Sequence, residues 1–227
     1  MLELTKYQNQ GLLWYGQKND QLAGRIRTGF EVFDQALAGG LPPQGLFEIK
    51  TPTGIGEIRL LLPYLVQKQS QGLVVFIAPP NLINAEFLLK NSIELDRVLI
   101  LNLYQPEEAL WAAEQCLRSG CCSAVLLWQK AISVTQARRL LLASEQGESS
   151  LLLYRPQAKQ QGFSIPATLS LTCQANTLGI QVRIDKQRGG RASEELIIAM
   201  HQQWPDLTEV PVEKQNNVLP FPQSATH

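Results

Sequence analysis

The stretch TGFEVFDQALAGGLPPQGLFEIKTPTGIGEIRLLL, residues 28–62, decides the fold. Within it, residues 46–49 form a short, mostly apolar run that predicts a strand, and residues 57–69 carry apolar residues along one side of a predicted helix. Between them lie Gly54 and Gly56, and glycine permits the tight turn that joins a strand to a helix. The stretch therefore predicts the strand–turn–helix unit with which an α/β domain begins.

The same alternation continues along the chain. Apolar runs predict further strands over 73–78, 98–101, 124–128 and 151–154, and helical periodicity predicts helices over 81–91, 106–119 and 133–146. Such alternation through short loops produces a mostly parallel sheet with helices on both faces. Three strand-like runs over 168–172, 178–184 and 195–200 follow without a helix, so we expect antiparallel strands at one edge of the sheet.

The sequence divides into three parts. Its 227 residues suit one α/β domain with a short appendage at each end. We expect an N-terminal arm over residues 1–27, a core domain over 28–201 and a flexible C-terminal tail over 202–227. The tail is rich in Gln, Asn, Pro and Thr, which bury too little apolar surface to fold alone.

The charges of the chain cancel. Lys and Arg together number 20, as do Asp and Glu, so the overall field steers the chain neither to DNA nor to membranes, and a nucleic-acid contact needs a local patch. The four cysteines form no C-x-x-C pair and no histidine lies near them, which argues against a zinc site. Without a signal peptide or a long apolar span, the sequence predicts a cytoplasmic protein with no membrane contact.

Residues 28–62 resemble the segment that leads into the ATPase core of RecA-like proteins. The matching positions are Thr28, Gly29, Asp34, Leu37, Gly39, Gly40 and Gly45. In those proteins the segment ends in a phosphate loop, G-x-x-x-x-G-K-S/T, whose lysine neutralises the terminal phosphate and whose hydroxyl holds Mg²⁺. The resemblance implies a RecA-like fold.

The chemistry of that loop is missing here. With Gly56 aligned to its last glycine, Thr51 falls at the first glycine, Glu57 at the lysine and Ile58 at the hydroxyl residue. A carboxylate repels a phosphate, and isoleucine cannot bind magnesium. The fourth predicted strand ends in Trp128, where these ATPases carry the aspartate that positions Mg²⁺. We therefore expect a protein that is not an enzyme and holds no cofactor, and these replacements disfavour the alternative of an active RecA-type ATPase.

Longer blocks of sequence resemble the ImuA family. They are GEIRLLLPYL (56–65), VVFIAPP (74–80), EEALWAAEQCLRSGCCSAVLLW (107–128), QARRLLLASEQG (136–147), LYRP (153–156), IPATLSL (165–171) and DKQRGGR (185–191). ImuA-like proteins act in SOS mutagenesis and DNA repair after DNA damage. The resemblance implies a protein that binds RecA and an ImuB-like relative of Y-family polymerases, and that supports translesion synthesis by an error-prone C-family DNA polymerase.

A more distant resemblance, to the cell-division inhibitor SulA, implies the alternative role of binding FtsZ. SulA is shorter at both ends, and it carries a tryptophan in the strand that corresponds to residues 73–77, where this chain has none. RecA-like cores often assemble head to tail, so the sequence is compatible with a homo-oligomer. Direct binding of single-stranded DNA stays open.

The predicted helix over 106–119 offers the first candidate contact residues. It places Trp111 opposite the apolar stripe, on a charged face with Glu114 and Arg118. Tryptophan is enriched at binding hot spots, so Trp111 and Arg118 are candidates for partner binding. The alternative is that the N-terminal arm covers Trp111.

A basic segment and the tail supply the remaining candidates. The basic residues are Arg183, Lys186, Arg188 and Arg191. They suit contact with DNA phosphates or an acidic partner, and the alternative is an ordinary solvated hairpin. In the tail, Trp204 and Phe221 are candidates for anchoring the chain to a partner.

Overall fold

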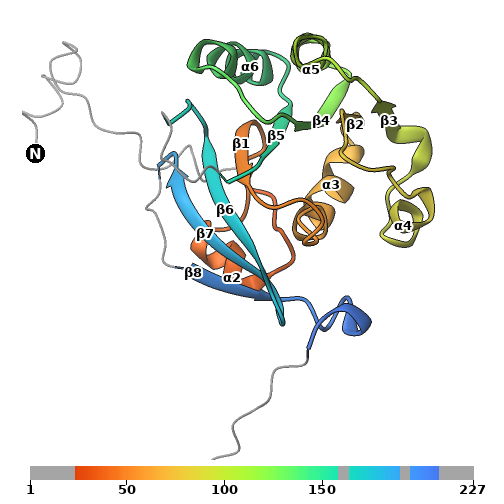
Figure 1. Ribbon diagram of the computed structural model, residues 1–227, viewed down its shortest axis with the longest axis vertical. Coiled ribbons are helices and arrows are strands. Elements are labelled where there is room, and N and C mark those ends of the chain that lie inside the picture. Colours follow the sequence, from red (N-terminus) through yellow and green to blue (C-terminus); the bar gives the residue numbers. More distant parts are fainter. Residues whose placement is uncertain (1–23, 158–163, 190–194, 210–227) are drawn as a thin grey trace, which may run out of the picture.

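One eight-stranded sheet forms the centre of the protein, with helices against both faces (Figure 1). The computed structural model describes residues 24–157, 164–189 and 195–209. Within them the strands lie in the order β3-β2-β4-β5-β1-β6-β7-β8. This arrangement confirms the predicted α/β class, with a mostly parallel sheet and antiparallel strands at one edge.

The strands from β3 to β6 in that order run parallel. They are β1 (Gly45–Lys50), β2 (Leu73–Ile77), β3 (Val98–Leu101), β4 (Cys122–Trp128), β5 (Ser150–Arg155) and β6 (Leu169–Asn176). The central β1, β4 and β5 are buried along nearly their whole length, and β4 and β5 accordingly have long apolar runs.

Two layers of helices cover the sheet. On one face lie α2 (Glu31–Ala36), α3 (Leu62–Gln69) and α4 (Ala85–Lys90), and on the other lie α5 (Pro106–Arg118) and α6 (Val134–Gln146). Successive strand residues point to opposite faces. Val74 and Phe76 of β2 therefore enter the core under α3, whereas Val75 and Ile77 enter the core under α5.

The helix after β1 begins later than the sequence predicts. Residues Arg59–Leu61 form a 3-10 turn (η2), and α3 starts only at Leu62. A helix that began at Glu57 would hold Pro63 in its interior, where proline removes a hydrogen bond and clashes with the preceding turn. In the first turn of α3 its missing N–H costs no intrahelical bond.

The helix after β2 is also shorter than the prediction of residues 81–91. It runs from Ala85 to Lys90 because Asn84 caps its beginning. The side-chain oxygen of Asn84 accepts a hydrogen bond from the Phe87 N–H at 3.1 Å, and its backbone is extended. Another 3-10 turn, η3 (Leu95–Arg97), then leads into β3.

The last strands extend the sheet as predicted. Antiparallel pairing joins β6 to β7 (Gly179–Gln187) and β7 to β8 (Glu195–Ala199). On its other side, β6 runs parallel to β1, with Phe47 opposite Leu169. The predicted antiparallel strands are thus confirmed, and β6 joins them to the parallel part of the sheet. Since β5 and β6 both run parallel to β1, the chain after β5 must return to the opposite end of the sheet before β6 begins.

The segment that resembles RecA-like proteins has a structural role at the start of the domain. The buried Thr28 donates from its backbone N–H (2.7 Å) and its hydroxyl (2.8 Å) to Asp34 Oδ1, which holds the turn before α2. Gly40 has a φ of +122°, and a Cβ there would lie 2.3 Å from the carbonyl oxygen of Ile26. These positions thus require their residue types for the fold alone.

Residues 24–157, 164–189 and 195–209 contain neither a membrane-spanning helix nor a metal-binding cluster. No helix in these ranges has both the length and the apolar character of a membrane span, and no group of three or more His, Cys, Asp or Glu could hold a metal ion. The cysteines are free: Cys122 and Cys173 are buried, Cys116 is half-buried and Cys121 is exposed.

Candidate functional site

The loop after β1 keeps the glycine turn of a phosphate loop but not its helix. Gly54 and Gly56 both adopt positive φ, +87° and +94°, a conformation that other residues rarely adopt. Thr51 is buried at the end of β1, and its hydroxyl donates to the Pro52 carbonyl oxygen at 2.8 Å. Because α3 begins only at Leu62, the glycine turn does not feed directly into a helix N-terminus, where phosphates are usually bound.

Glu57 fills the interior of this loop. Its side chain is only 5% exposed, and its Oε1 accepts a hydrogen bond from the backbone N–H of Gly54 at 3.2 Å. In a phosphate loop such N–H groups bind the nucleotide. Here the Glu57 carboxylate accepts the hydrogen bond that a phosphate would otherwise receive. Its negative charge also repels a phosphate, so the loop disfavours phosphate binding for two reasons. Ile58 is half-buried against the core under α3.

An aromatic stack occupies the predicted Mg²⁺ position. The ring of Trp128 at the end of β4 stacks on Tyr154 of β5, with centroids 4.8 Å apart and an interplanar angle of 11°. Phe76 lies on the other side of the indole, with its centroid at 6.3 Å. Burial, followed by the charge of Glu57, raises the pKa of Tyr154 well above its usual range, so its hydroxyl stays protonated.

A crevice lies at the carboxyl ends of the strands. The neighbouring strands β2 and β4 are followed by helices on opposite faces, α4 and α6, and such a reversal opens a crevice where α/β proteins bind ligands. A cleft of about 730 Å³ lies there between the starts of α5 and α6, and it shares Ala78, Trp128 and Lys130 with a hollow that the loop after β1 lines.

Two smaller hollows meet at Glu57. One, of about 280 Å³, is lined by Thr51, Gln129 and Tyr154 among others, and one of about 220 Å³ extends over Gly54 and Arg59. The residues that line both are Thr53, Glu57, Pro80 and Trp128. The Glu57 carboxylate and the Trp128 indole therefore form a wall that the two hollows share, at the position of the degenerate phosphate loop.

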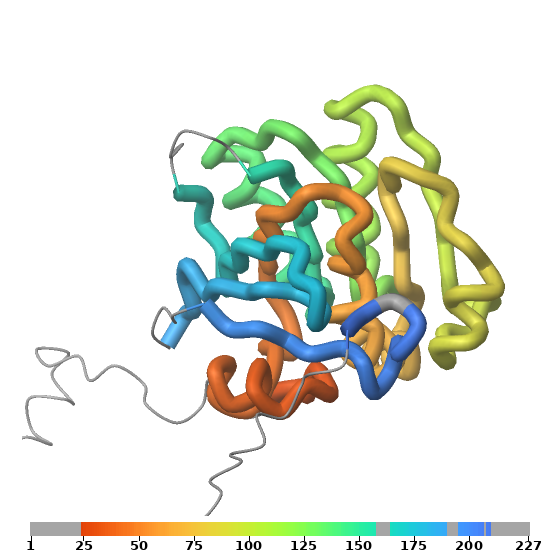
Figure 2. Tube along the Cα trace, turned by 60° about the horizontal axis from the view of Figure 1, so that its bottom comes forward, coloured from red at the N-terminus to blue at the C-terminus, as the bar shows by residue number. Residues whose placement is uncertain are grey.

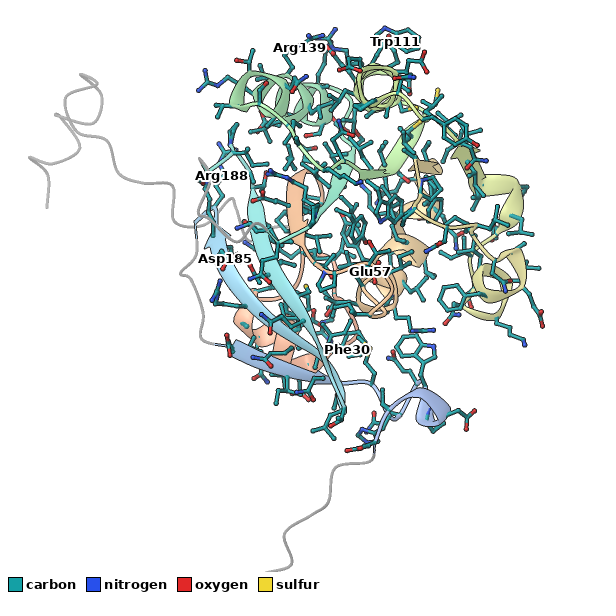
Figure 3. All side chains as sticks on the ribbon, viewed as in Figure 1. Phe30, Glu57, Trp111, Arg139, Asp185 and Arg188 are labelled. Atoms are coloured by element: carbon teal, nitrogen blue, oxygen red, sulfur yellow. The ribbon has the colours of Figure 1, made fainter. Side chains whose placement is uncertain are left out.

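Trp111 lies away from this site, on the outer side of α5 (Figure 3). Its side chain is 64% exposed, as the sequence predicts. Arg118 is exposed too, but Glu114 is not: it is 5% exposed and forms ion pairs with Arg118 at 3.3 Å and with Arg139 of α6. Glu114 lines the same hollow as Trp111, but the α5–α6 contact covers it.

The basic segment after Arg183 is largely paired within the chain. Arg183 donates to Asp185 at 2.7 Å, and Arg188 forms an ion pair with Glu145 of α6 at 3.1 Å. Lys186 is exposed on β7. Arg191 lies outside the described residues. The segment is therefore partly neutralised by its own carboxylates, which weakens its attraction for phosphates.

Sequence reasoning missed Glu48, the centre of a buried charge network. This β1 residue is 5% exposed, accepts from Arg155 Nη1 at 2.7 Å and from Ser170 Oγ at 2.8 Å, and lies 3.8 Å from the Lys50 ammonium. Lys50 also contacts Asp185 at 3.1 Å. The only signal in the sequence was two charges, at positions 48 and 50, inside an otherwise apolar strand.

The first residues of the predicted tail pack against the domain (Figure 2). The half-buried Trp204 contacts the core under α3, and its ring lies 6.0 Å from the Arg59 guanidinium, which also faces Phe87 at 5.5 Å. A 3-10 turn (η4, Pro205–Leu207) follows. The prediction of a flexible tail from residue 202 onward is therefore wrong for its first residues, which pack against the domain as far as η4. Phe221 lies outside the described residues.

Comparisons with known proteins point to two related groups. A family model described as "Cell division inhibitor SulA" matches residues 51–150. Over 177 residues, 77% of this chain, the sequence is 25% identical to Protein RecA of Bifidobacterium longum. It is 29% identical over 100 residues, 44% of this chain, to the cell division inhibitor SulA of Photorhabdus laumondii. The chain is therefore similar to both RecA and SulA proteins.

The extent of these similarities is limited. The aligned residues of this chain cover 43% of the Bifidobacterium RecA and 56% of the Photorhabdus SulA, about half the length of these relatives. Among solved structures, the crystal structure of SulA from Pseudomonas aeruginosa matches 49% of this chain and 98% of its own, with 25% identity and a TM-score of 0.41. The narrower ImuA resemblance is not tested by these comparisons.

Proposed function

We propose that this chain is a non-catalytic accessory protein of the SOS response that works by binding other proteins. The observation that carries the proposal is the buried Glu57 carboxylate, which accepts the Gly54 N–H inside a loop of phosphate-binding type. With Trp128 at the Mg²⁺ position as well, both parts of a nucleotide site carry side chains that cannot serve a nucleotide and its metal ion. Similarity to RecA and SulA supports an SOS-associated role.

The partners that we propose are RecA and an ImuB-like polymerase relative, within an error-prone translesion-synthesis complex. Support comes from the ImuA-like segments at 165–171 and 185–191, which lie beyond the part that matches the SulA model. Trp111 adds an exposed aromatic of the kind that anchors protein interfaces. In this proposal the chain works by binding its partners, so it does not need to bind or hydrolyse ATP.

Co-purification from DNA-damaged cells tests this proposal. Tagged full-length chain is expected to recover RecA or the ImuB-like protein, and Trp111→Ala to recover less. A matched control is Leu142→Ala, which removes an apolar side chain of similar exposure (57%) from the neighbouring α6. A second comparison uses a chain that ends at residue 209, because this keeps Trp204 and η4 and removes only the rest of the tail. Recovery of neither protein by the full chain contradicts the proposal.

A second candidate function is inhibition of cell division by binding FtsZ. The match of residues 51–150 to the SulA model favours it. Purified chain would then lower the amount of FtsZ polymer that sediments in the presence of GTP, whereas an accessory of translesion synthesis would leave it unchanged. Recovery of FtsZ without RecA or the ImuB-like protein would decide for this function.

A further inference from the structure

Glu57 is a buried charge that lacks a cationic partner among the described residues. Carboxylates that are this deeply buried are normally paired. The Glu57 carboxylate offers about four acceptor positions, and among the described residues it receives one hydrogen bond, from Gly54 N–H at 3.2 Å, and no ion pair within 4.0 Å. The remaining acceptor capacity faces the two hollows that meet at this side chain.

The three cationic residues that line the two hollows either contact other groups or are exposed to solvent. Arg59 faces the rings of Phe87 and Trp204, and Arg155 donates to Glu48 at 2.7 Å. Lys130 is exposed to solvent at the rim. Among the charged residues that line the two hollows, Glu57 is the one that is buried, whereas Arg59 and Arg155 are half-buried. A phosphate site instead places a cation or N–H groups at this position.

Two aromatic groups complete the hollow of about 280 Å³. Tyr154 lines this hollow, and its hydroxyl is fully buried without a hydrogen-bond partner among the described residues. The half-exposed Trp128 indole forms a wall, and aromatic faces attract ammonium and guanidinium groups. A carboxylate and two aromatic side chains around one hollow match the chemistry of a basic side chain.

The size of the hollows agrees with a side chain rather than a larger ligand. At about 220 and 280 Å³, each is smaller than the roughly 300–1,000 Å³ typical of pockets for drug-sized molecules. We propose that the degenerate phosphate loop is a receptor for a single arginine or lysine side chain of a protein partner, with Glu57 as the counter-ion. This inference rests on the proposed protein-binding function and names what the partner inserts.

The first test measures the affinity of the partner. Glu57→Gln removes the charge but keeps an oxygen that can accept the Gly54 N–H, so the loop is expected to stay folded. Removing one member of a buried charge pair costs enough to weaken binding about thirtyfold or more. Binding of purified RecA or ImuB-like protein to the full chain should fall by this factor in Glu57→Gln. Glu108→Gln, at an exposed glutamate in the first turn of α5, should change it less than about twofold.

The second test is independent of the partner's identity. Ethylguanidinium chloride is titrated into the ¹⁵N-labelled full chain, against sodium chloride at equal ionic strength, and the tryptophan indole signals are followed by NMR. A Trp128→Phe variant assigns the Trp128 signal. We expect a saturable shift of that signal in the wild-type chain and in Glu108→Gln, and none in Glu57→Gln.

The outcomes separate the inference from the proposed function. If RecA or the ImuB-like protein binds, and neither the affinity nor the indole shift depends on Glu57, the inference is wrong and the proposed function stands. If no partner binds but the ethylguanidinium shift depends on Glu57, the proposed function fails and the cation receptor stands. Equal shifts in the wild-type chain and Glu57→Gln, or no shift in either, overturn the receptor.

Discussion

The Trp128 indole stacks on the Tyr154 ring at 4.8 Å, at the strand ends where a RecA-like ATPase would assemble its Mg²⁺ site. Phe76 extends this contact on the other side of the indole, at 6.3 Å. A residue that binds Mg²⁺ must present an accessible oxygen ligand, and an indole has none. Trp128 instead packs against the core under α3. The position where a RecA-like ATPase holds Mg²⁺ thus contributes to the core in this chain.

Trp128→Ala is therefore expected to lower the free energy of unfolding by about 2–3 kcal/mol, toward the low end for tryptophan truncation because the ring is half-exposed. Trp111→Ala removes the same side chain from an exposed position and should cost less than about 0.5 kcal/mol. Urea denaturation followed by circular dichroism measures both. Equal losses in the two variants would mean that the stack adds nothing to stability.

Restoring the phosphate-loop residues should not restore nucleotide binding. The double variant Glu57→Lys, Ile58→Thr supplies the missing ammonium and hydroxyl, but Trp128 still offers no Mg²⁺ ligand and α3 still begins at Leu62. A ligand that binds the folded state raises the melting temperature. We expect that millimolar Mg²⁺–ATP changes this temperature in neither the wild-type chain nor the double variant. If Mg²⁺–ATP raised the melting temperature of the double variant and phosphate were released, the loss of nucleotide binding would be due to Glu57 and Ile58 alone.

Much of the fold was predictable because its signals are local. Apolar runs predicted β2 and β4, and Ser133 and Gly147 marked the ends of α6, where Ser133 forms a capping box with Gln136. The start of α3 was missed because leucine spacing outweighed Pro63, which is the residue that sets it. Long-range pairings leave no such signal. Nothing near β6 in the sequence indicates that it lies parallel to β1.

The candidate site was predictable in identity but not in geometry. Alignment to the phosphate loop identified Glu57 and Trp128 as replacements. However, neither the bond from Gly54 to Glu57 nor the stack on Tyr154 follows from spacing, because each joins segments whose packing depends on the whole sheet. The same holds for Glu114, whose burial depends on α6 and on Arg139.

The Glu48–Arg155 pair should contribute measurably to stability. Glu48 is 5% exposed, and Glu48→Gln leaves the Arg155 guanidinium, 22% exposed, without its counter-charge. Breaking a buried pair costs about 3–5 kcal/mol, and partial access of Arg155 to water reduces this to about 2 kcal/mol. Glu86→Gln breaks an exposed pair with Lys90 in α4 and should cost less than about 0.5 kcal/mol. A double-mutant cycle with Arg155→Met isolates the coupling, and a coupling near zero would contradict the prediction.

Asp185 should make stability depend on pH in the acid range. Burial alone would raise the pKa of Asp185, but hydrogen bonds from Thr172, Arg183 and Lys50 outweigh it and hold this pKa below its ordinary value of 3.8. The unfolded chain therefore binds a proton more readily than the folded chain at this residue. Its contribution to stability is complete above the ordinary value and disappears as the pH falls through the lowered pKa.

Unfolding of wild-type and Asp185→Asn chains between pH 7 and pH 2.5 measures this contribution. We expect the wild-type chain to be the more stable at pH 6–7, and the difference between the two to shrink steadily below about pH 4, because the wild-type aspartate is then increasingly protonated. Asp96→Asn, at an exposed position in η3, should give a curve parallel to that of the wild-type chain over the whole range. A constant difference for Asp185→Asn would mean that its hydrogen bonds, rather than its charge, stabilise the edge formed by β6 and β7.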